Sequence, residues 1–211
     1  MLTPTGVHAQ TAARGVELDT EHAARLINML LATVDSPEGR AAREGCDRSA
    51  EQHRAVWLAL MTSAATGFLP AAASEVLAES VYACLVDPRS WSPYPDTVEV
   101  LTRLHAEGLQ LGVVSNIGWD IRLAFEKIRV AELVDSFALS CECGSVKPEP
   151  ALFQVACAEL AVPPERVLFV GDDPIKDGAA ARLGMPVYVL PGPRSPDRPR
   201  GLAAVLALAT S

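Results

Sequence analysis

The sequence has no long apolar run, no secretion signal at its start and no surplus of positive charge. Aspartate and glutamate number 26 against 18 lysines and arginines, which gives a formal net charge of -8 over 211 residues. This balance disfavours nucleic acid or an anionic membrane surface as the main partner. No apolar stretch approaches the roughly 20 residues of a membrane span, and the N-terminus lacks the charged and apolar regions of a signal peptide. We therefore expect a cytoplasmic protein that binds neither nucleic acid nor membrane.

Cysteines are few, and their number is odd. The five lie at positions 46, 84, 141, 143 and 157. An odd number favours a reducing compartment over a disulfide framework. Cys141 and Cys143 are one residue apart and have no second pair, whereas structural zinc sites need wider spacing and four ligands. Hydrophobic residues make up 49% of the chain, so the sequence predicts a folded core that depends on neither disulfides nor zinc.

The first 86 residues contain no convincing strand and are predicted to be helical. One helix starts at Asp19, a second follows Ser49, and a third covers 71–86. Ser49 opens a Ser-Ala-Glu-Gln segment, which is the capping-box pattern. Residues 37–47 are polar, contain two glycines and are predicted to be a connection. We expect these helices to form a separate domain over 1–90.

A proline-rich linker at 87–95 precedes a different pattern, in which strands and helices alternate. The predicted strands are 109–114, 136–139, 167–170 and 187–190. The predicted helices are 96–107, 117–127, 150–160, 179–183 and 202–208, with a polar loop at 194–200. Strands that alternate with helices imply a parallel sheet with right-handed crossovers. The fold class predicted for the second domain, residues 91–211, is therefore α/β.

Three aspartates directly follow the third predicted strand. The apolar run 167–170 ends at Gly171, and Asp172, Asp173 and Asp177 come next, before an alanine-rich helix. Ligands of open α/β sheets bind just past the carboxyl ends of the strands. Three carboxylates within six residues indicate a site for a hard cation with oxygen ligands, such as magnesium. The alternative is a polar turn with a helix cap.

Polar residues also follow the first two strands. Ser115 and Asn116 end the first strand, and Lys147 lies in the loop after the second. Because the carboxyl ends of parallel strands share one edge, these residues and the aspartates can converge into a phosphate-binding set. Alternatives stay open for each member. The serine and asparagine could cap a helix, and the lysine could be a solvated loop residue paired with Glu142 or Glu149.

These motifs resemble those of a known family. The second, third and fourth signatures of the haloacid dehalogenase superfamily of hydrolases are matched in order by Ser115-Asn116, by Lys147-Pro148, and by Gly171-Asp172-Asp173 with Asp177. The resemblance covers about residues 90–192 and implies a Rossmann-like three-layer core with a parallel sheet. The helical residues 1–90 resemble the cap that these proteins insert after their first strand.

The resemblance also implies roles for the residues. Ser115 and Asn116 would bind the phosphate of a small phosphorylated substrate, and Lys147 would secure both the phosphate and the nucleophile. The carboxylates that would ligate magnesium or support its shell are Asp172, Asp173 and Asp177. The implied activity is magnesium-dependent hydrolysis of phosphomonoesters, because adjacent aspartates suit a metal better than they suit dehalogenation.

The first signature of the family is absent from the sequence. It is a strand ending in Asp-x-Asp-x-(Thr/Val) near the N-terminus, and its first Asp is the nucleophile. Here Leu18-Asp19-Thr20 has one Asp and no apolar strand before it. Without this signature, phosphoryl transfer has no acceptor and magnesium loses a main ligand. The prediction is therefore an inactive or truncated phosphatase or, alternatively, a pseudoenzyme that binds a phosphorylated ligand or a protein partner.

The missing strand would be the central one of the sheet. Its neighbours would be left with backbone groups that lack partners in the core. Three arrangements stay open at this point. The sheet closes up, another segment or a second subunit of a homo-oligomer fills the gap, or the natural start lies upstream.

Overall fold

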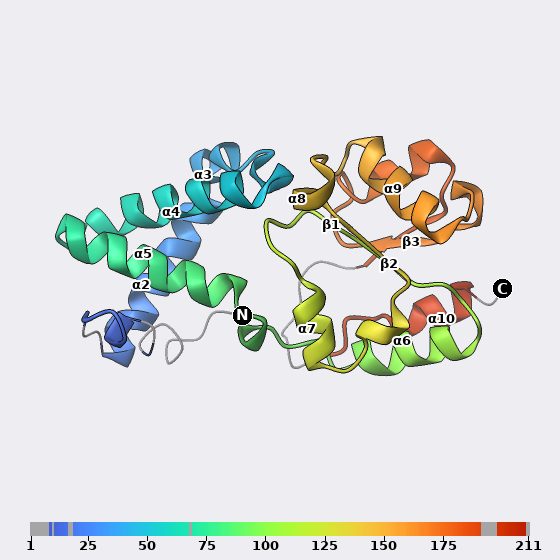
Figure 1. Ribbon diagram of the computed structural model, residues 1–211, viewed down its shortest axis with the longest axis horizontal. Coiled ribbons are helices and arrows are strands. Elements are labelled where there is room, and N and C mark those ends of the chain that lie inside the picture. The colour runs from blue at the N-terminus through green and yellow to red at the C-terminus, as the bar shows by residue number, and fades with distance from the viewer. Residues whose placement is uncertain (1–8, 10, 17–18, 68, 191–197, 210–211) are drawn as a thin grey trace. The chain divides into compact units, whose positions relative to one another are not determined.

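The structure is a computed structural model that describes residues 9, 11–16, 19–67, 69–190 and 198–209. The chain divides into two compact units, Met1–Trp91 and Ser92–Ser211, shown in Figure 1. We call them unit 1 and unit 2. The predicted boundary after residue 90 lies one residue from this division, and the role of unit 1 as a cap stays a prediction.

Unit 1 is helical in its described part. Its elements are α2 (Thr20–Asp35), α3 (Pro37–Ala42), the 3-10 helix η1 (Cys46–Arg48), α4 (Ala50–Thr66), α5 (Ala71–Val86) and the 3-10 helix η2 (Pro88–Ser90). The third predicted helix is confirmed over its full range. Ser49 caps α4 as its pattern predicts, because its hydroxyl accepts from Gln52 N at 3.1 Å.

The connection predicted at 37–47 is wrong, because α3 and η1 form there. The Ser36 hydroxyl accepts from Gly39 N at 3.0 Å, and Pro37 occupies the first helical position. Gly39 is buried so close to the Thr33 carbonyl that a side chain at this position would overlap it. The glycine that suggested a loop therefore serves close packing of α3 against the end of α2.

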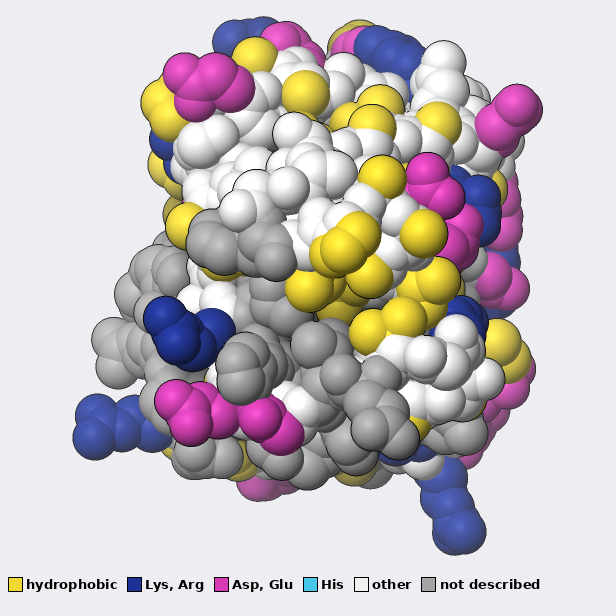
Figure 2. Space-filling model, turned by 90° about the vertical axis from the view of Figure 1, so that its left-hand side faces the viewer, with side chains coloured by type: hydrophobic (Ala, Val, Ile, Leu, Met, Phe, Trp, Pro, Cys, Tyr) yellow, Lys and Arg dark blue, Asp and Glu magenta, His cyan; other side chains and the backbone are white. Residues whose placement is uncertain are grey.

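The core of unit 1 joins α2, α4 and α5. Leu30, Met61, Leu77 and Val81 are each no more than 2% exposed. A polar pair lies beside this core, because His53 Nδ1 is 2.9 Å from the Tyr82 hydroxyl. Figure 2 shows a side of the molecule on which hydrophobic side chains gather in one area, with charged side chains around it.

Burial of His53 predicts a stability change in mild acid. Burial lowers the pKa of His53, and the nearby Asp47 carboxylate only partly opposes this shift. A lowered pKa in the folded state gives stability that is present above the usual histidine pKa of about 6.5 and lost as pH falls through the folded value. We expect the thermal midpoint of the wild type to fall between about pH 7.5 and about pH 5.5.

Circular dichroism at both pH values checks this expectation. His53→Gln should show a smaller drop, and the matched control His105→Gln, which changes an exposed histidine, should keep the wild-type drop. An equal drop in His53→Gln and the wild type would contradict the assignment.

Unit 2 confirms the α/β class with parallel strands, but these strands form two pairs instead of one sheet. The strands are β1 (Gly112–Ser115), β2 (Ser136–Leu139), β3 (Phe169–Gly171) and β4 (Val187–Val189). Gly112 of β1 is in register with Ser136 of β2, and Phe169 of β3 with Val187 of β4. In the described part of the chain, β1 pairs only with β2, and β3 only with β4. The prediction that the four strands form one sheet is therefore wrong, although the strands are parallel as predicted.

The strands of unit 2 lie between two layers of helices (Figure 1). Helices α8 (Ser140–Cys143) and α9 (Pro150–Leu160) lie on one side, and α6 (Thr97–Ala106), α7 (Arg122–Lys127) and α10 (Ala203–Ala209) on the other. Apolar side chains of α9 pack with residues of both strand pairs, whereas those of α6 and α10 pack with residues of β3 and β4. This is the predicted Rossmann-like three-layer arrangement, and it brings the strand ends to one region.

Several predicted elements of unit 2 are shorter in the structure. The helix expected from Ile117 begins only at Arg122, because Ile117 N donates to the Ser140 hydroxyl at 2.9 Å and ties the chain to the end of β2. The strand expected from Leu109 begins at Gly112, after Leu109 N bonds back to Leu104 O at the end of α6. The helix predicted at 179–183 is the 3-10 helix η5 (Gly178–Leu183).

The remaining short elements of unit 2 are the 3-10 helices η3 (Ala131–Leu133) and η4 (Pro164–Arg166). Most of the loop predicted at 194–200 lies outside the described residues. Among the residues that the structure describes, no helix has both the length and the apolar character to cross a membrane.

Candidate functional site

A buried ion pair stands at the carboxyl ends of β1 and β3. Lys147 Nζ is 2.7 Å from Asp177 Oδ1 and donates to the Val114 carbonyl at 3.1 Å. The lysine side chain is 13% exposed and the aspartate side chain 4%. The lysine therefore neutralises Asp177 and satisfies a main-chain group of β1 at once, so it is not the solvated loop lysine of the alternative interpretation. Glu142 instead binds Arg122, through two hydrogen bonds of 2.6 and 2.9 Å.

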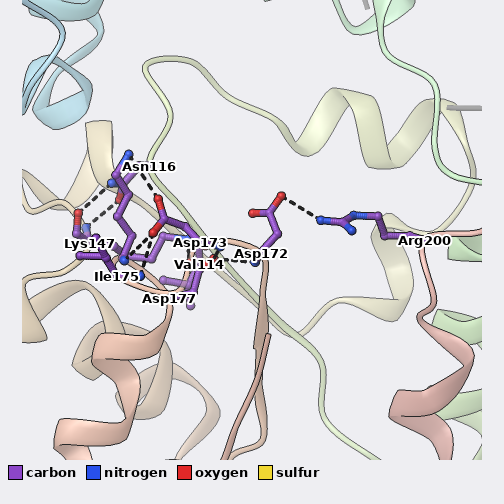
Figure 3. Close-up of polar contacts among 9 residues, drawn as sticks. Val114, Asn116, Lys147, Asp172, Asp173, Ile175, Asp177 and Arg200 are labelled. Carbon is purple, nitrogen blue, oxygen red and sulfur yellow. Dashed lines mark hydrogen bonds and ion pairs between the residues drawn. The ribbon is translucent and has the colours of Figure 1, made fainter. Parts of the chain in front are cut away.

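The other carboxylate oxygen of Asp177 organises the turn after β3. Asp177 Oδ2 accepts from the main-chain N–H groups of Asp172 and Asp173 at 2.8 and 2.9 Å. Burial would raise the pKa of Asp177, but the bonds from Lys147 and from these main-chain groups outweigh burial and hold the pKa below its usual range. The carboxylate does not cap η5, because it points back toward the turn. Figure 3 shows this cluster with Val114 and Asn116 beside it.

Gly171 is required at its position by the approach of Asp177. A Cβ at Gly171 would overlap the Asp177 carboxylate, whereas a Cβ at Gly178 would have nothing within 4 Å. We expect Gly171→Ala to lower the free energy of unfolding by about 1–3 kcal/mol, as overpacking does. Gly178→Ala is the matched control and should be neutral or stabilising by up to about 1 kcal/mol. Urea unfolding of both variants measures the difference, and equal values for the two would contradict this packing.

Asn116 holds the main chain of Lys147 in place. Asn116 Oδ1 accepts from Lys147 N at 2.7 Å, and Asn116 Nδ2 donates to Lys147 O at 3.0 Å. The peptide bond between Lys147 and Pro148 is cis. These contacts give Asn116 a positioning function toward the lysine, and its predicted contact with a substrate stays a prediction. Neither Ser115 nor Asn116 caps α7, which begins six residues after Asn116.

The Ser115 hydroxyl is a free hydrogen-bonding group at the end of β1. Ser115 is half-buried, and its hydroxyl has no hydrogen-bond partner within the part of the chain that the structure describes. Lys147 Nζ binds the carbonyl of Val114, the residue just before Ser115. The Lys147 ammonium group therefore lies at the end of the strand that carries Ser115, and phosphate binding by these two residues stays a prediction.

Asp173 is a turn residue in this structure. Its Oδ1 accepts from the main-chain N–H groups of Ile175 and Lys176, both at 2.9 Å. Side-chain bonds of this kind from an aspartate to nearby N–H groups stabilise turns. For Asp173, the alternative interpretation as part of a polar turn therefore agrees with the contacts.

Asp172 faces a cation that the sequence analysis missed. Its side chain is 61% exposed and Asp172 Oδ2 is 3.0 Å from Arg200 Nη2, while the arginine side chain is only 5% exposed. Figure 3 shows Asp172 turned toward Arg200 and away from the Lys147 cluster. Arg200 was predicted only as part of a polar loop, because an arginine between a proline and a glycine carries no local signal.

Asp96 anchors the segment that carries Arg200. Its two carboxylate oxygens accept from the main-chain N–H groups of Arg200, Gly201 and Leu202 at 2.8 to 2.9 Å. Burial raises the pKa of Asp96, but these three bonds outweigh it and lower the pKa. The Arg200 guanidinium also lies 5.7 Å from the centre of the Tyr94 ring. Asp96 was predicted as a helix start, but its carboxylate does not bond to α6.

The three predicted metal ligands do not form a ready magnesium site. Both oxygens of Asp177 are engaged, one oxygen of Asp173 holds the turn, and Asp172 is paired with Arg200. Magnesium needs near-octahedral oxygen ligands. Across the described ranges, no group of three or more His, Cys, Asp or Glu side chains is placed to hold a metal ion. The arrangement therefore does not fit a resident magnesium ion.

A separate cavity of about 860 Å³ lies wholly within unit 1. Its lining comes from α4, α5 and the segment before α2, and includes Arg14, Leu58, Thr62, Glu75 and Glu79. It contains none of the predicted site residues, so it is not part of the site at the strand ends.

The fold and the strand-end cluster define an α/β protein of the Rossmann-like type, with polar groups after three of its parallel strands. The family follows from a direct comparison. A model of the haloacid dehalogenase-like hydrolase family matches residues 5–184, and the chain belongs to this family.

Curated relatives include both phosphatases and a dehalogenase. The chain is 37% identical over 98 residues to a phosphoserine phosphatase of Thermus thermophilus, covering 45% of this chain and 39% of the relative. It is 35% identical over 96 residues to a glyceraldehyde 3-phosphate phosphatase of Methanopyrus kandleri, covering 44% and 41%. It is 32% identical over 95 residues to (S)-2-haloacid dehalogenase 4A of Burkholderia cepacia, covering 44% and 41%. The match thus spans about two fifths of each of these relatives.

Solved structures show the same fold. A dehalogenase crystal structure aligns with a TM-score of 0.61 at 19% identity, covering 96% of this chain and 90% of that one. The HAD phosphatase from Thermococcus onnurineus aligns with a TM-score of 0.57 at 21% identity, covering 97% and 86%. At this identity the likeness concerns the fold alone.

Proposed function

We propose that the chain binds the phosphate group of a small phosphorylated molecule at the ends of β1 and β3. The observation that carries the proposal is the position of Lys147 Nζ, which Val114 O and Asp177 Oδ1 hold at the end of β1, where the next residue is Ser115. An ammonium group has three donors, and two are used here, so one remains for a ligand oxygen. Together, the remaining lysine donor and the serine hydroxyl suit a phosphate oxygen.

The reaction class that we propose for the scaffold is hydrolysis of a phosphomonoester. Two of the relatives described above are named as phosphatases, and the ligand proposed for the Lys147 ammonium group is a phosphate. Asp177 is not available as a nucleophile for this reaction. Asp177 is the carboxylate that binds Lys147, and its two oxygens already accept bonds from the lysine and from two main-chain N–H groups.

The second candidate is a binding protein without turnover. It is favoured by the same engaged carboxylate and by the pairing of Asp172 with Arg200, because neither aspartate is poised to attack phosphorus. The 211-residue chain is therefore expected to bind phosphate and to release little or none from phosphomonoesters. Robust phosphate release that Asp172→Asn abolishes would contradict this expectation.

Calorimetric titration with inorganic phosphate tests the binding proposal. Ser115→Ala should weaken phosphate binding about 3- to 10-fold, because it removes one hydrogen bond to the phosphate. Ser92→Ala, which changes an exposed serine of the same unit, is the matched control and should bind like the wild type. Identical affinities for the wild type and Ser115→Ala would remove this serine from the site.

A further inference from the structure

Arg200 is a buried cation, and one of its contacts is an ion pair with an exposed carboxylate. The guanidinium side chain is 5% exposed, while the Asp172 side chain is 61% exposed, with 3.0 Å between Arg200 Nη2 and Asp172 Oδ2. A desolvated guanidinium is costly unless an anion compensates it. The arrangement therefore holds Asp172 to Arg200 more firmly than a pair of two mobile surface side chains would be held.

The position of Arg200 is fixed by contacts that do not depend on Asp172. The Asp96 carboxylate holds the main-chain N–H groups at 200–202, and Gly201 takes a φ of 97°, where glycine is favoured. The Tyr94 ring lies against the guanidinium at 5.7 Å from its centre. The fold thus places a positive charge next to Asp172, whose carboxylate, unlike those of Asp173 and Asp177, makes no hydrogen bond to other described residues of that turn.

We propose that Arg200 is a built-in counter-cation that excludes divalent metal ions from Asp172. Asp177 uses both of its oxygens within the protein and Asp173 uses one, so Asp172 would be the main carboxylate ligand of a divalent ion approaching the turn. Such an ion would have to displace the guanidinium and would meet its repulsion. This accounts for the poor fit between the three aspartates and magnesium, and it is independent of whether the site binds phosphate.

Removal of the guanidinium should therefore give Asp172 a measurable affinity for a divalent ion. The test measures binding of Mn²⁺ alone by electron paramagnetic resonance, in the absence of phosphate, so that its failure differs from a failure of the proposed function. Arg200→Gln should bind Mn²⁺ at least about threefold more tightly than the wild type, the scale of a partly exposed ion pair. The main-chain bonds from 200–202 to Asp96 remain in this variant, so the segment keeps its anchor.

Two controls separate a local effect from a general change of charge. Arg166→Gln removes an equal charge from an exposed arginine of unit 2 that has no carboxylate partner among the described residues, so it should leave Mn²⁺ binding unchanged. Arg200→Gln in an Asp172→Asn background should lose the gain. If Arg200→Gln does not fold, Arg200→Lys replaces it and should show a smaller gain, because lysine loses the fixed fork of the guanidinium.

Three results would overturn the proposal. One is an unchanged or weaker Mn²⁺ affinity in Arg200→Gln, which includes the case in which neither protein binds the ion. Another is a gain that persists without the Asp172 carboxylate. The third is an equal gain in Arg166→Gln.

Discussion

Replacing Asp177 by alanine is expected to lower the free energy of unfolding of unit 2 by about 3–5 kcal/mol, the cost of breaking a buried ion pair. The change leaves the Lys147 ammonium, whose side chain is 13% exposed, without its anion. It also removes the acceptor of two main-chain N–H groups, at Asp172 and Asp173. Urea unfolding followed by circular dichroism measures the loss.

Asp173→Ala is the matched control for this prediction. Asp173 lies in the same turn and also accepts two main-chain bonds, but its side chain is 39% exposed and its nearest cation, Lys176 Nζ, is 4.0 Å away. We expect this variant to lose about 0.5–2 kcal/mol, like a lost cap. If both variants unfold at the same urea concentration, Asp177 does not have the structural role assigned to it.

The stability of unit 2 in acid follows from the direction of the pKa shift of Asp177. The pKa of Asp177 is lowered in the folded protein, so its contribution to stability is present above the usual aspartate pKa of about 3.9 and is lost as pH falls through the folded value. Asp96 shifts in the same direction through its three main-chain bonds. The loss of stability in strong acid is therefore expected in the segments around Asp96 and Asp177.

Replacing Lys147 by methionine is expected to weaken phosphate binding about 10- to 100-fold, as loss of a charge-assisted hydrogen bond does. Methionine keeps much of the volume of the side chain but cannot donate to a phosphate oxygen, to Asp177 or to the Val114 carbonyl. Titration with inorganic phosphate under conditions in which the variant is folded measures the change. Lys127→Met, which alters an exposed lysine of α7, should bind like the wild type. Wild-type affinity in Lys147→Met would contradict the proposed function.

Local sequence patterns predict two elements of unit 2 with the bounds that the structure has. The strand at 136–139 and the helix at 150–160 have the bounds predicted, the helix with proline at its first position. Errors arise where a distant contact decides the outcome. The chain at Ile117 is not helical because a serine 23 residues away binds its main chain. The splitting of the strands into two pairs likewise depends on which strands lie side by side, which no local pattern records.

The candidate site was predictable in membership but not in detail. The order of the motifs predicted Ser115, Lys147 and Asp177 as site residues. The structure places Lys147 Nζ 2.7 Å from Asp177 Oδ1. The sequence could not show that Asp177 would use both of its oxygens within the protein. It also could not show Arg200, whose segment is fixed by an aspartate more than 100 residues earlier in the chain.

The most direct test of phosphate binding at the ends of β1 and β3 is the position of a heavy phosphate analogue. Anomalous scattering from tungstate soaked into crystals of the protein would locate it. The proposal predicts a tungstate oxygen about 2.7–3.0 Å from both Ser115 Oγ and Lys147 Nζ. Tungstate found elsewhere, with these two groups contacting none of its oxygens, would contradict the proposal.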